Sequence, residues 1–174
     1  FPEPSGESAE GGKHGFGKGR QRDEPNFEAL PDSIPPQNLE AEEAVLGGIL
    51  LDPDAIGRVA DVLQPEAFYL NAHREIFRTA VMLHSQGKPT DLTAMTAWLA
   101  DTGSLEKVGG SPRLVELVER VASTASIEQV ARLVMDKFLR RQLIRSGNEV
   151  IQLGFDQSMP MDQVLDKAEQ TIFA

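Results

Sequence analysis

The most constraining feature of the sequence is residues 126–154, which are typical of one long helix whose apolar side changes partway along. At 100° per residue, one face collects Ile127, Val130, Ala131, Val134 and Phe138. Roughly the opposite face collects Leu139, Leu143, Gly147 and Val150. Ser126 is a suitable N-cap and Gly154 a suitable residue just after the last turn. Such a helix must pack against two different neighbours, and with no Pro or Gly near Phe138 a break into two helices there has no evident cause.

The second half of this stretch also carries locally concentrated positive charge. Lys137, Arg141 and Arg145 repeat every four residues, and Arg140 lies beside them. Like charges at this spacing repel weakly along a helix. The pattern is typical of a solvated face, the simpler interpretation, or of an arm presented to acidic surroundings.

The composition limits the class of protein. The 174 residues include no cysteine, which excludes disulfides and thiolate metal sites and agrees with a reducing cytoplasm. No segment is typical of a signal peptide or a membrane span, so we expect a cytoplasmic protein that does not contact a membrane. The net charge is −10, of which residues 35–174 contribute −7, and this acidity argues against duplex nucleic acid as the principal ligand.

Residues 1–34 are rich in Gly, Pro, Glu and Ser without hydrophobic periodicity, so we expect a disordered tail. Residues 12–19 resemble a phosphate-binding loop, except that Gly19 replaces the hydroxyl residue that would hold magnesium. Neither a strand before the motif nor a helix after it is predicted. A nucleotide site here is therefore disfavoured.

Residues 35–125 are predicted to form a helical globule. Capping residues predict helix starts at Asn38, Asp52, Asn71, Asp91 and Ser111, with no convincing strand between them. Within the first helix, Gly47 and Gly48 predict the close approach of another helix. Three carboxylates near the start of this helix are interpreted as favourable to its positive end: Glu40, Glu42 and Glu43.

After Gly154, Pro160 is predicted to open a last helix that returns along the long one. Its apolar stripe holds Met161, Val164, Leu165, Ala168 and Ile172, suited to lie against residues 139–150. The predicted fold is thus all-α, with a compact globule at 35–125 followed by a helical hairpin at 126–174. The hairpin's apolar surface exceeds what its own return helix covers, which is typical of contact with a second subunit.

The histidines and the carboxylates of the first helix raise two other kinds of site. His73 and His84 are eleven positions apart with no third ligand at suitable spacing, so structural histidines are favoured over a metal site. A hydrolase that uses Glu40, Glu42 and Glu43 with His73 is also disfavoured, because capping and core packing account for each residue.

Several motifs together resemble the N-terminal domain of the bacterial replicative DNA helicase, the DnaB family. They are Ile34-Pro35-Pro36-Gln37-Asn38-Leu39-Glu40-Ala41-Glu42, Val45-Leu46-Gly47-Gly48, Phe68-Tyr69 ahead of His73 and Ile76-Phe77, Gly87-Lys88-Pro89-Thr90-Asp91-Leu92, Val108-Gly109-Gly110, Thr124-Ala125-Ser126-Ile127 and Ala168-Glu169-Gln170-Thr171-Ile172-Phe173. The resemblance runs in order and almost without gaps from about Ile34 to Ala174. Only the tail lies outside it.

The resemblance implies an assembly domain without catalysis of its own. Members of the family are hexameric rings that move 5′ to 3′ on single-stranded DNA, driven by ATP and Mg²⁺ in a C-terminal RecA-like motor that this sequence lacks. No cofactor is therefore expected in this chain. The implied partners are further copies in a trimer-of-dimers collar, a DnaG-type primase and a helicase loader, with single-stranded DNA bound mainly by the motor.

On this basis we expect five residues to form the subunit interface of the hairpin: Leu139, Leu143, Val150, Ile151 and Leu165. Four basic residues are expected to act on partners through their charge: Lys137, Arg140, Arg141 and Arg145. The alternative is a stand-alone nucleic-acid-binding domain that uses these same four residues.

Overall fold

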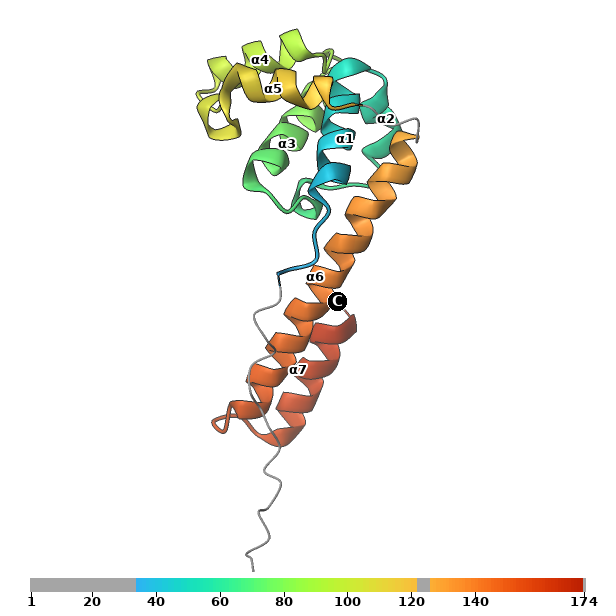
Figure 1. Cartoon of the computed structure of the whole chain (residues 1–174). Helices are drawn as coiled ribbons and strands as arrows, with labels where there is room; N and C mark the ends of the chain where they lie inside the picture. The colour runs from blue at the N-terminus through green and yellow to red at the C-terminus, as the bar shows by residue number, and fades with distance from the viewer. Residues whose placement is uncertain (1–33, 122–125, 174) are drawn as a thin grey trace, which may run out of the picture. The chain divides into compact units, whose positions relative to one another are not determined.

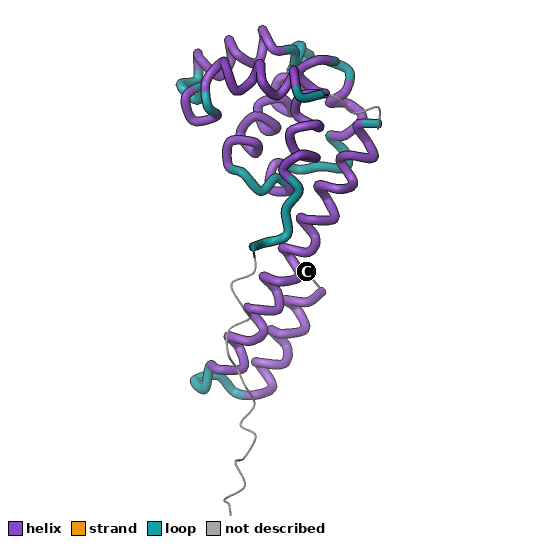
Figure 2. The backbone as a smooth tube through the Cα atoms, in the orientation of Figure 1, coloured by secondary structure: helices purple, strands orange, loops and turns teal. Residues whose placement is uncertain are grey.

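The computed structural model describes residues 34–121 and 126–173, and all regular structure within these ranges is helical (Figures 1 and 2). The phosphate-loop-like motif at 12–19 lies outside the described residues. The elements in chain order are α1 (Leu39–Leu51), α2 (Ala55–Val59), the 3₁₀ helix η1 (Pro65–Ala67), α3 (Asn71–Ser85), α4 (Leu92–Asp101), the 3₁₀ helix η2 (Glu106–Val108), α5 (Gly110–Glu119), α6 (Ile127–Phe155) and α7 (Met161–Phe173). The all-α prediction is confirmed.

The globule is built around α1, which contacts α2, α3, α4, α5 and α6. Gly47 on α1 faces α5 so closely that a Cβ atom there would lie 2.2 Å from the carbonyl oxygen of Leu117. Gly48 faces α6, where a Cβ atom would lie 3.2 Å from the Ile127 side chain. The predicted close approach at this glycine pair is therefore confirmed, and it explains why two poor helix formers lie inside a buried helix.

Of the six predicted capping residues, three are confirmed and three are wrong, among them Ser111, which lies inside α5 because that helix begins at Gly110. The side chains of Asn38, Asp91 and Ser126 each accept a hydrogen bond from the backbone N–H three residues on. Asp52, however, accepts from Asp54 and Arg58, and α2 begins only at Ala55. Asn71 is already the first residue of α3 and accepts from Arg74. Both side chains can bond locally to other donors, a choice that spacing alone does not settle.

The long helix α6 is unbroken from Ile127 to Phe155, with no break near Phe138. Its first half belongs to the core of the globule through Val130, Ala131, Val134 and Phe138, all of which are buried. The prediction that Gly154 ends the helix is wrong by two residues. Gly154 keeps a helical backbone and Asp156 is the C-cap, because a glycine permits the left-handed conformation without requiring it.

The return helix α7 packs on the second half of α6, as predicted, so that the two form a hairpin (Figure 1). The contact face of α7 differs from the predicted stripe. Val164 is buried and Ala168 and Thr171 are half-buried, whereas Met161, Leu165 and Ile172 are exposed. The helix is thus rotated toward its smaller residues, which allows the two axes to approach more closely and leaves the larger apolar side chains outside.

A buried, hydrogen-bonded pair of side chains joins α1 to α3. The Nδ1 atom of His73 lies 2.8 Å from Glu42 Oε2, and the backbone N–H of Tyr69 donates to Glu42 Oε1 at 2.6 Å. Both ionisable side chains are almost fully buried, with 1 % of each residue exposed. Glu42 does lie in the first turn of α1, as predicted, but its carboxylate also has a tertiary role that the sequence did not indicate. Its side chain turns into the globule, where a carboxylate needs partners of this kind to be tolerated.

A second set of charges joins α1 to α5. Glu43 accepts from Arg113 at 2.6 Å and from Arg120 at 2.8 Å, and both arginines also pair with Glu116. Burial by itself raises the pKa of the Glu43 carboxyl, but the hydrogen bonds and charges of the two arginines outweigh it and hold that pKa below its usual value. Glu43 therefore also has a tertiary role rather than the predicted one. Of the three carboxylates, Glu40 is the one exposed at the first turn.

The glycine contacts predict opposite effects for two alanine substitutions. Gly47→Ala should lower the free energy of unfolding by about 1–3 kcal/mol, because the new methyl group meets backbone atoms of α5. Gly147→Ala should raise it by up to about 1 kcal/mol, because Gly147 is helical with open space around it. Urea unfolding followed by circular dichroism measures both. Equal stability of Gly47→Ala and the parent chain would contradict the close packing.

The Glu43 cluster predicts a pH dependence of stability. Because the pKa of Glu43 is lower in the folded than in the unfolded chain, its contribution is present above the ordinary carboxyl pKa of about 4.3 and is lost as the pH falls. Between about pH 6 and pH 3 the parent chain should lose more unfolding free energy than Glu43→Gln. Glu119→Gln, an exposed carboxyl on α5, is the control and should behave like the parent. Parallel pH profiles for all three proteins would contradict this role.

Candidate interaction surface

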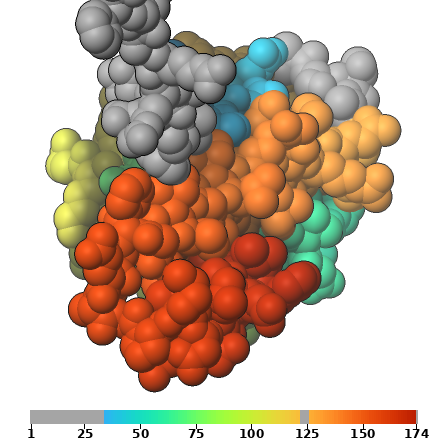
Figure 3. All heavy atoms as spheres, turned by 90° about the horizontal axis from the view of Figure 1, so that it is seen from below, coloured from blue at the N-terminus to red at the C-terminus, as the bar shows by residue number. Residues whose placement is uncertain are grey.

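The hairpin exposes most of its large apolar residues. Of the five predicted interface residues, Leu143 is 74 % exposed, Leu139 59 %, Leu165 58 % and Ile151 49 %, whereas Val150 is half-buried. Figure 3 views the molecule from the end at which α6 turns into α7, and atoms of these two helices fill the foreground. An apolar surface of this kind on a helix pair is typical of a protein contact site.

The predicted interface residues do not share one side of α6. Beyond Arg141, the half-buried residues mark the side covered by α7: Gln142, Ser146, Val150 and Leu153. Leu143 lies about 20° around the helix from Val150, at the edge of that side, and Leu139 lies about 40° from Leu143. Ile151 lies about 80° around the helix from Leu143 and about 20° from Ile144, on the side away from α7. The structure therefore brings Leu139 and Leu143 together but separates Ile151 from them.

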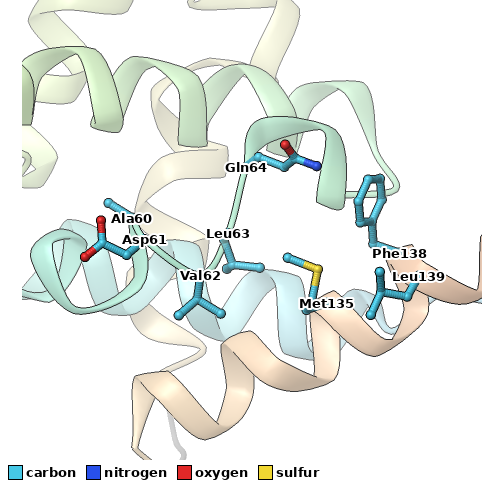
Figure 4. Close-up of a pocket in the computed structure, with 8 residues that line it drawn as sticks. All are labelled: Ala60, Asp61, Val62, Leu63, Gln64, Met135, Phe138 and Leu139. Atoms are coloured by element: carbon cyan, nitrogen blue, oxygen red, sulfur yellow. The ribbon is translucent and has the colours of Figure 1, made fainter. Parts of the chain in front are cut away.

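A shallow groove joins the globule to this apolar edge. Its wall on one side is formed by the segment after α2, from Ala60 to Gln64, and on the other by Met135, Phe138 and Leu139 of α6 (Figure 4). The groove encloses about 470 Å³. Leu139 lines both the groove and the exposed edge of the hairpin. This wall was not predicted from the sequence, although the adjacent apolar residues Val62 and Leu63 were the available signal.

Two of the four predicted basic residues pair with the same neighbouring carboxylate. Arg140 donates to Asp136 at 3.0 Å, and the Lys137 ammonium lies 3.7 Å from the same side chain. The Arg140 hydrogen bond and both positive charges hold the pKa of Asp136 below its usual value. These exposed pairs contribute little stability but neutralise part of the basic character of the helix.

The other two basic residues differ sharply from each other. Arg141 is half-buried and donates to the backbone carbonyls of Pro36 and Ala67 at 2.7 and 2.5 Å. Arg145, one turn further along α6, is exposed and has no hydrogen bond or ion pair within the described residues. The four residues therefore do not form one basic surface, and the guanidinium of Arg141 is turned inward.

No group of three or more His, Asp or Glu side chains in residues 34–121 and 126–173 is placed to hold a metal ion. Glu42 and His73 do meet, but they are buried, and the His73 Nε2 atom faces Arg113 at 3.4 Å. Since an arginine only donates, Nε2 is oriented to accept and Nδ1–H donates to Glu42, which leaves no ring nitrogen for a substrate.

Among the helices in the described parts of the chain, none combines the length and the apolar character that crossing a lipid bilayer requires.

Comparison with known proteins agrees with this architecture. The family model of the DnaB-like helicase N terminal domain matches residues 34–136. Replicative DNA helicase DnaB of Nostoc sp. is 56 % identical over 140 residues, which are 80 % of this chain and 16 % of that protein. Replicative DNA helicase DnaC of Bacillus subtilis is 40 % identical over 143 residues, 82 % of this chain and 32 % of that protein. The chain thus spans a third or less of the length of these relatives.

Two solved structures are also similar. The N-terminal domain of DnaB helicase from Mycobacterium tuberculosis superposes with a TM-score of 0.76 at 36 % identity, over 81 % of this chain and all of that one. A DnaB-like replicative helicase, described together with its interactions with primase, gives a TM-score of 0.66 at 29 % identity, over 78 % of this chain and 31 % of the other. From the family match and these relatives, the chain belongs to the DnaB-like helicase N-terminal domain family.

Proposed function

We propose that this chain is the assembly and primase-docking domain of a hexameric replicative DNA helicase. The observation that carries the proposal is the apolar hairpin, whose return helix leaves Leu139, Leu143 and Leu165 exposed. Large apolar side chains on both helices of a hairpin are stabilised when a second hairpin covers them. The first partner is therefore a second copy of the chain, and three such pairs would make the six-membered collar.

The second proposed partner is a DnaG-type primase. Support comes from the similar DnaB-like helicase whose solved structure is described together with its interactions with primase. The hairpin has a further apolar side around Ile144 and Ile151, turned away from α7, which a second copy placed on Leu143 need not cover. A helicase loader is a further proposed partner, to which no face is assigned.

The proposed parent protein unwinds duplex DNA in the 5′ to 3′ direction in the cytoplasm. The relatives are replicative helicases of which this chain spans a small share, so ATP, Mg²⁺ and most contacts to single-stranded DNA are assigned to a motor domain outside this sequence. The described residues support this division of labour, because their ionisable groups pair with one another inside the globule rather than around an open cleft.

The alternative of a stand-alone nucleic-acid-binding domain has less support. It requires Lys137, Arg140, Arg141 and Arg145 to present their charge together. Two of these residues pair with Asp136, and Arg141 is turned toward backbone carbonyls. A phosphate-binding surface normally leaves several unpaired cations on one face.

Leu143→Asp tests the assembly. The substitution should weaken association by several kcal/mol, about 100-fold or more in the dissociation constant, because it places a charge in the apolar contact. Since Leu143 is 74 % exposed within one chain, the fold of the monomer should be unchanged. Sedimentation velocity across concentration measures the association. Leu51→Asp, an equally polar change at a residue 61 % exposed on the globule, is the control. An unchanged oligomer in Leu143→Asp would remove Leu143 from the interface.

Mass measurement with a purified primase C-terminal domain tests the docking. We expect a heavier complex that survives physiological salt, because apolar contacts depend only weakly on ionic strength. A single-stranded oligonucleotide offered in parallel should bind weakly, with affinity that falls steeply between low and physiological salt. Tight oligonucleotide binding at physiological salt with no primase complex would favour the alternative.

A further inference from the structure

Arg141 attaches α6 to the globule beyond Phe138, the last core residue of this helix. The core residues of α6 end with Phe138, and the exposed Arg140 faces away. The next turn contributes the inward-facing Arg141, and from Leu143 on the large apolar side chains are exposed or packed on α7. A contact at this position influences the direction of the whole hairpin, because the rest of α6 and all of α7 follow it along a single helix.

The guanidinium of Arg141 bridges two chain segments that are far apart in sequence. One terminal nitrogen donates to the carbonyl of Pro36, in the segment that leads into α1. The other donates to the carbonyl of Ala67, the last residue of η1. The same group lies 5.7 Å from the ring centre of Tyr69 and 5.9 Å from that of Phe138. Figure 1 shows the segment before α1 beside α6, in agreement with the hydrogen bond between Arg141 and Pro36.

The electrostatics of Arg141 are unusual for a half-buried cation. No carboxylate within residues 34–121 and 126–173 accepts a hydrogen bond from it. Burial is the main cause that lowers the pKa of its guanidinium, while the charge of Glu42 acts in the opposite direction. Two carbonyl oxygens and two aromatic rings compensate for the loss of water around the Arg141 guanidinium. Such a site fits the planar, two-pronged guanidinium and does not fit a lysine ammonium, which carries its charge at one point.

We propose that Arg141 is a positioning residue that sets the direction in which the hairpin leaves the globule. It joins α6 at once to the approach to α1 and to the end of η1, which leads directly into Tyr69 and so to the buried Glu42–His73 pair. The fourteen helical steps from Arg141 to Phe155 span about 21 Å, so a tilt of about 10° at Arg141 moves the tip by roughly 4 Å. That displacement is larger than the mismatch that a closely packed contact between two hairpins tolerates.

The consequence for assembly rests on the proposed function, but the positioning itself does not. A chain labelled at Glu119→Cys on α5 and Gln157→Cys in the turn between α6 and α7 reports the direction of the hairpin within one protomer. Both sites are exposed, and the sequence has no cysteine of its own. Dilution of the spin-labelled chain with unlabelled chain removes distances between subunits, so the readout is the same whether or not the chain assembles.

Pulsed electron paramagnetic resonance on the full chain is the test. The parent should give one narrow distance, and Arg141→Met should shift or broaden it by about 4 Å, because the aliphatic stem is kept while both hydrogen bonds are lost. Arg145→Met removes the same charge one turn away and should match the parent. Arg141→Met should also associate more weakly than Arg145→Met in sedimentation, whereas failed association of the parent itself would refute the assembly proposal alone.

Arg141→Lys is a second variant, which tests the same contacts if Arg141→Met folds poorly. It retains the charge and the stem but cannot reach both carbonyls together, so it should also broaden the distance distribution. A parent-like distribution in Arg141→Lys would overturn the claim that the two simultaneous carbonyl contacts set the direction. A parent-like distribution in Arg141→Met, or an equal change in Arg145→Met, would overturn the positioning role altogether.

Discussion

The structure depends on the continuity of α6, which spans 29 residues without a break. One half is fixed in the core of the globule and the other projects, so no hinge of irregular backbone separates the two parts. An α-helix of this length resists bending, because its hydrogen-bonded turns must distort together. The orientation of the hairpin is consequently decided where α6 meets the globule, at Phe138 and Arg141, rather than along the hairpin itself.

The globule holds its helices together with charges as well as apolar contacts. The close approach of α1 and α5 at Gly47 brings Glu43 opposite Arg113 and Arg120, and α3 places His73 beside Glu42. Removing one partner of such a buried set leaves an uncompensated charge, so these contacts specify one arrangement of helices even where their net contribution to stability is small. The same contacts occupy the groups that a catalytic site would need.

The hairpin has the opposite character. Its ionic contacts are few and exposed, and its largest apolar side chains are left uncovered by α7. A surface of this kind gains free energy mainly by association. The division between a globule that satisfies its own polar groups and an arm that leaves its apolar ones exposed is the physical basis for proposing an assembly and docking role rather than an enzymatic one.

Much of this architecture could be predicted from the sequence, since it follows from local patterns. Helical periodicity identified the two-sided character of residues 126–154, caps such as Asn38, Asp91 and Ser126 located helix starts, and the paired glycines indicated a close helix contact. Family motifs identified the relationship that the comparisons confirm. Each of these signals involves residues a few positions apart, whose interaction depends on backbone geometry common to all helices.

The tertiary structure alone decided which way individual polar side chains turn. Glu42, Glu43 and Arg141 each lie on a helix where an exposed role is plausible, and each instead meets partners from 27 to 105 positions away in the chain. The rotation of α7, which buries Val164 and leaves Leu165 exposed, likewise depends on how the whole contact surfaces of α6 and α7 pack together. The sequence by itself determined the helices and the apolar sides of the hairpin, because those are local properties. Contacts across the fold assigned the roles of its charges, because a side chain's environment depends on which distant segments pack beside it.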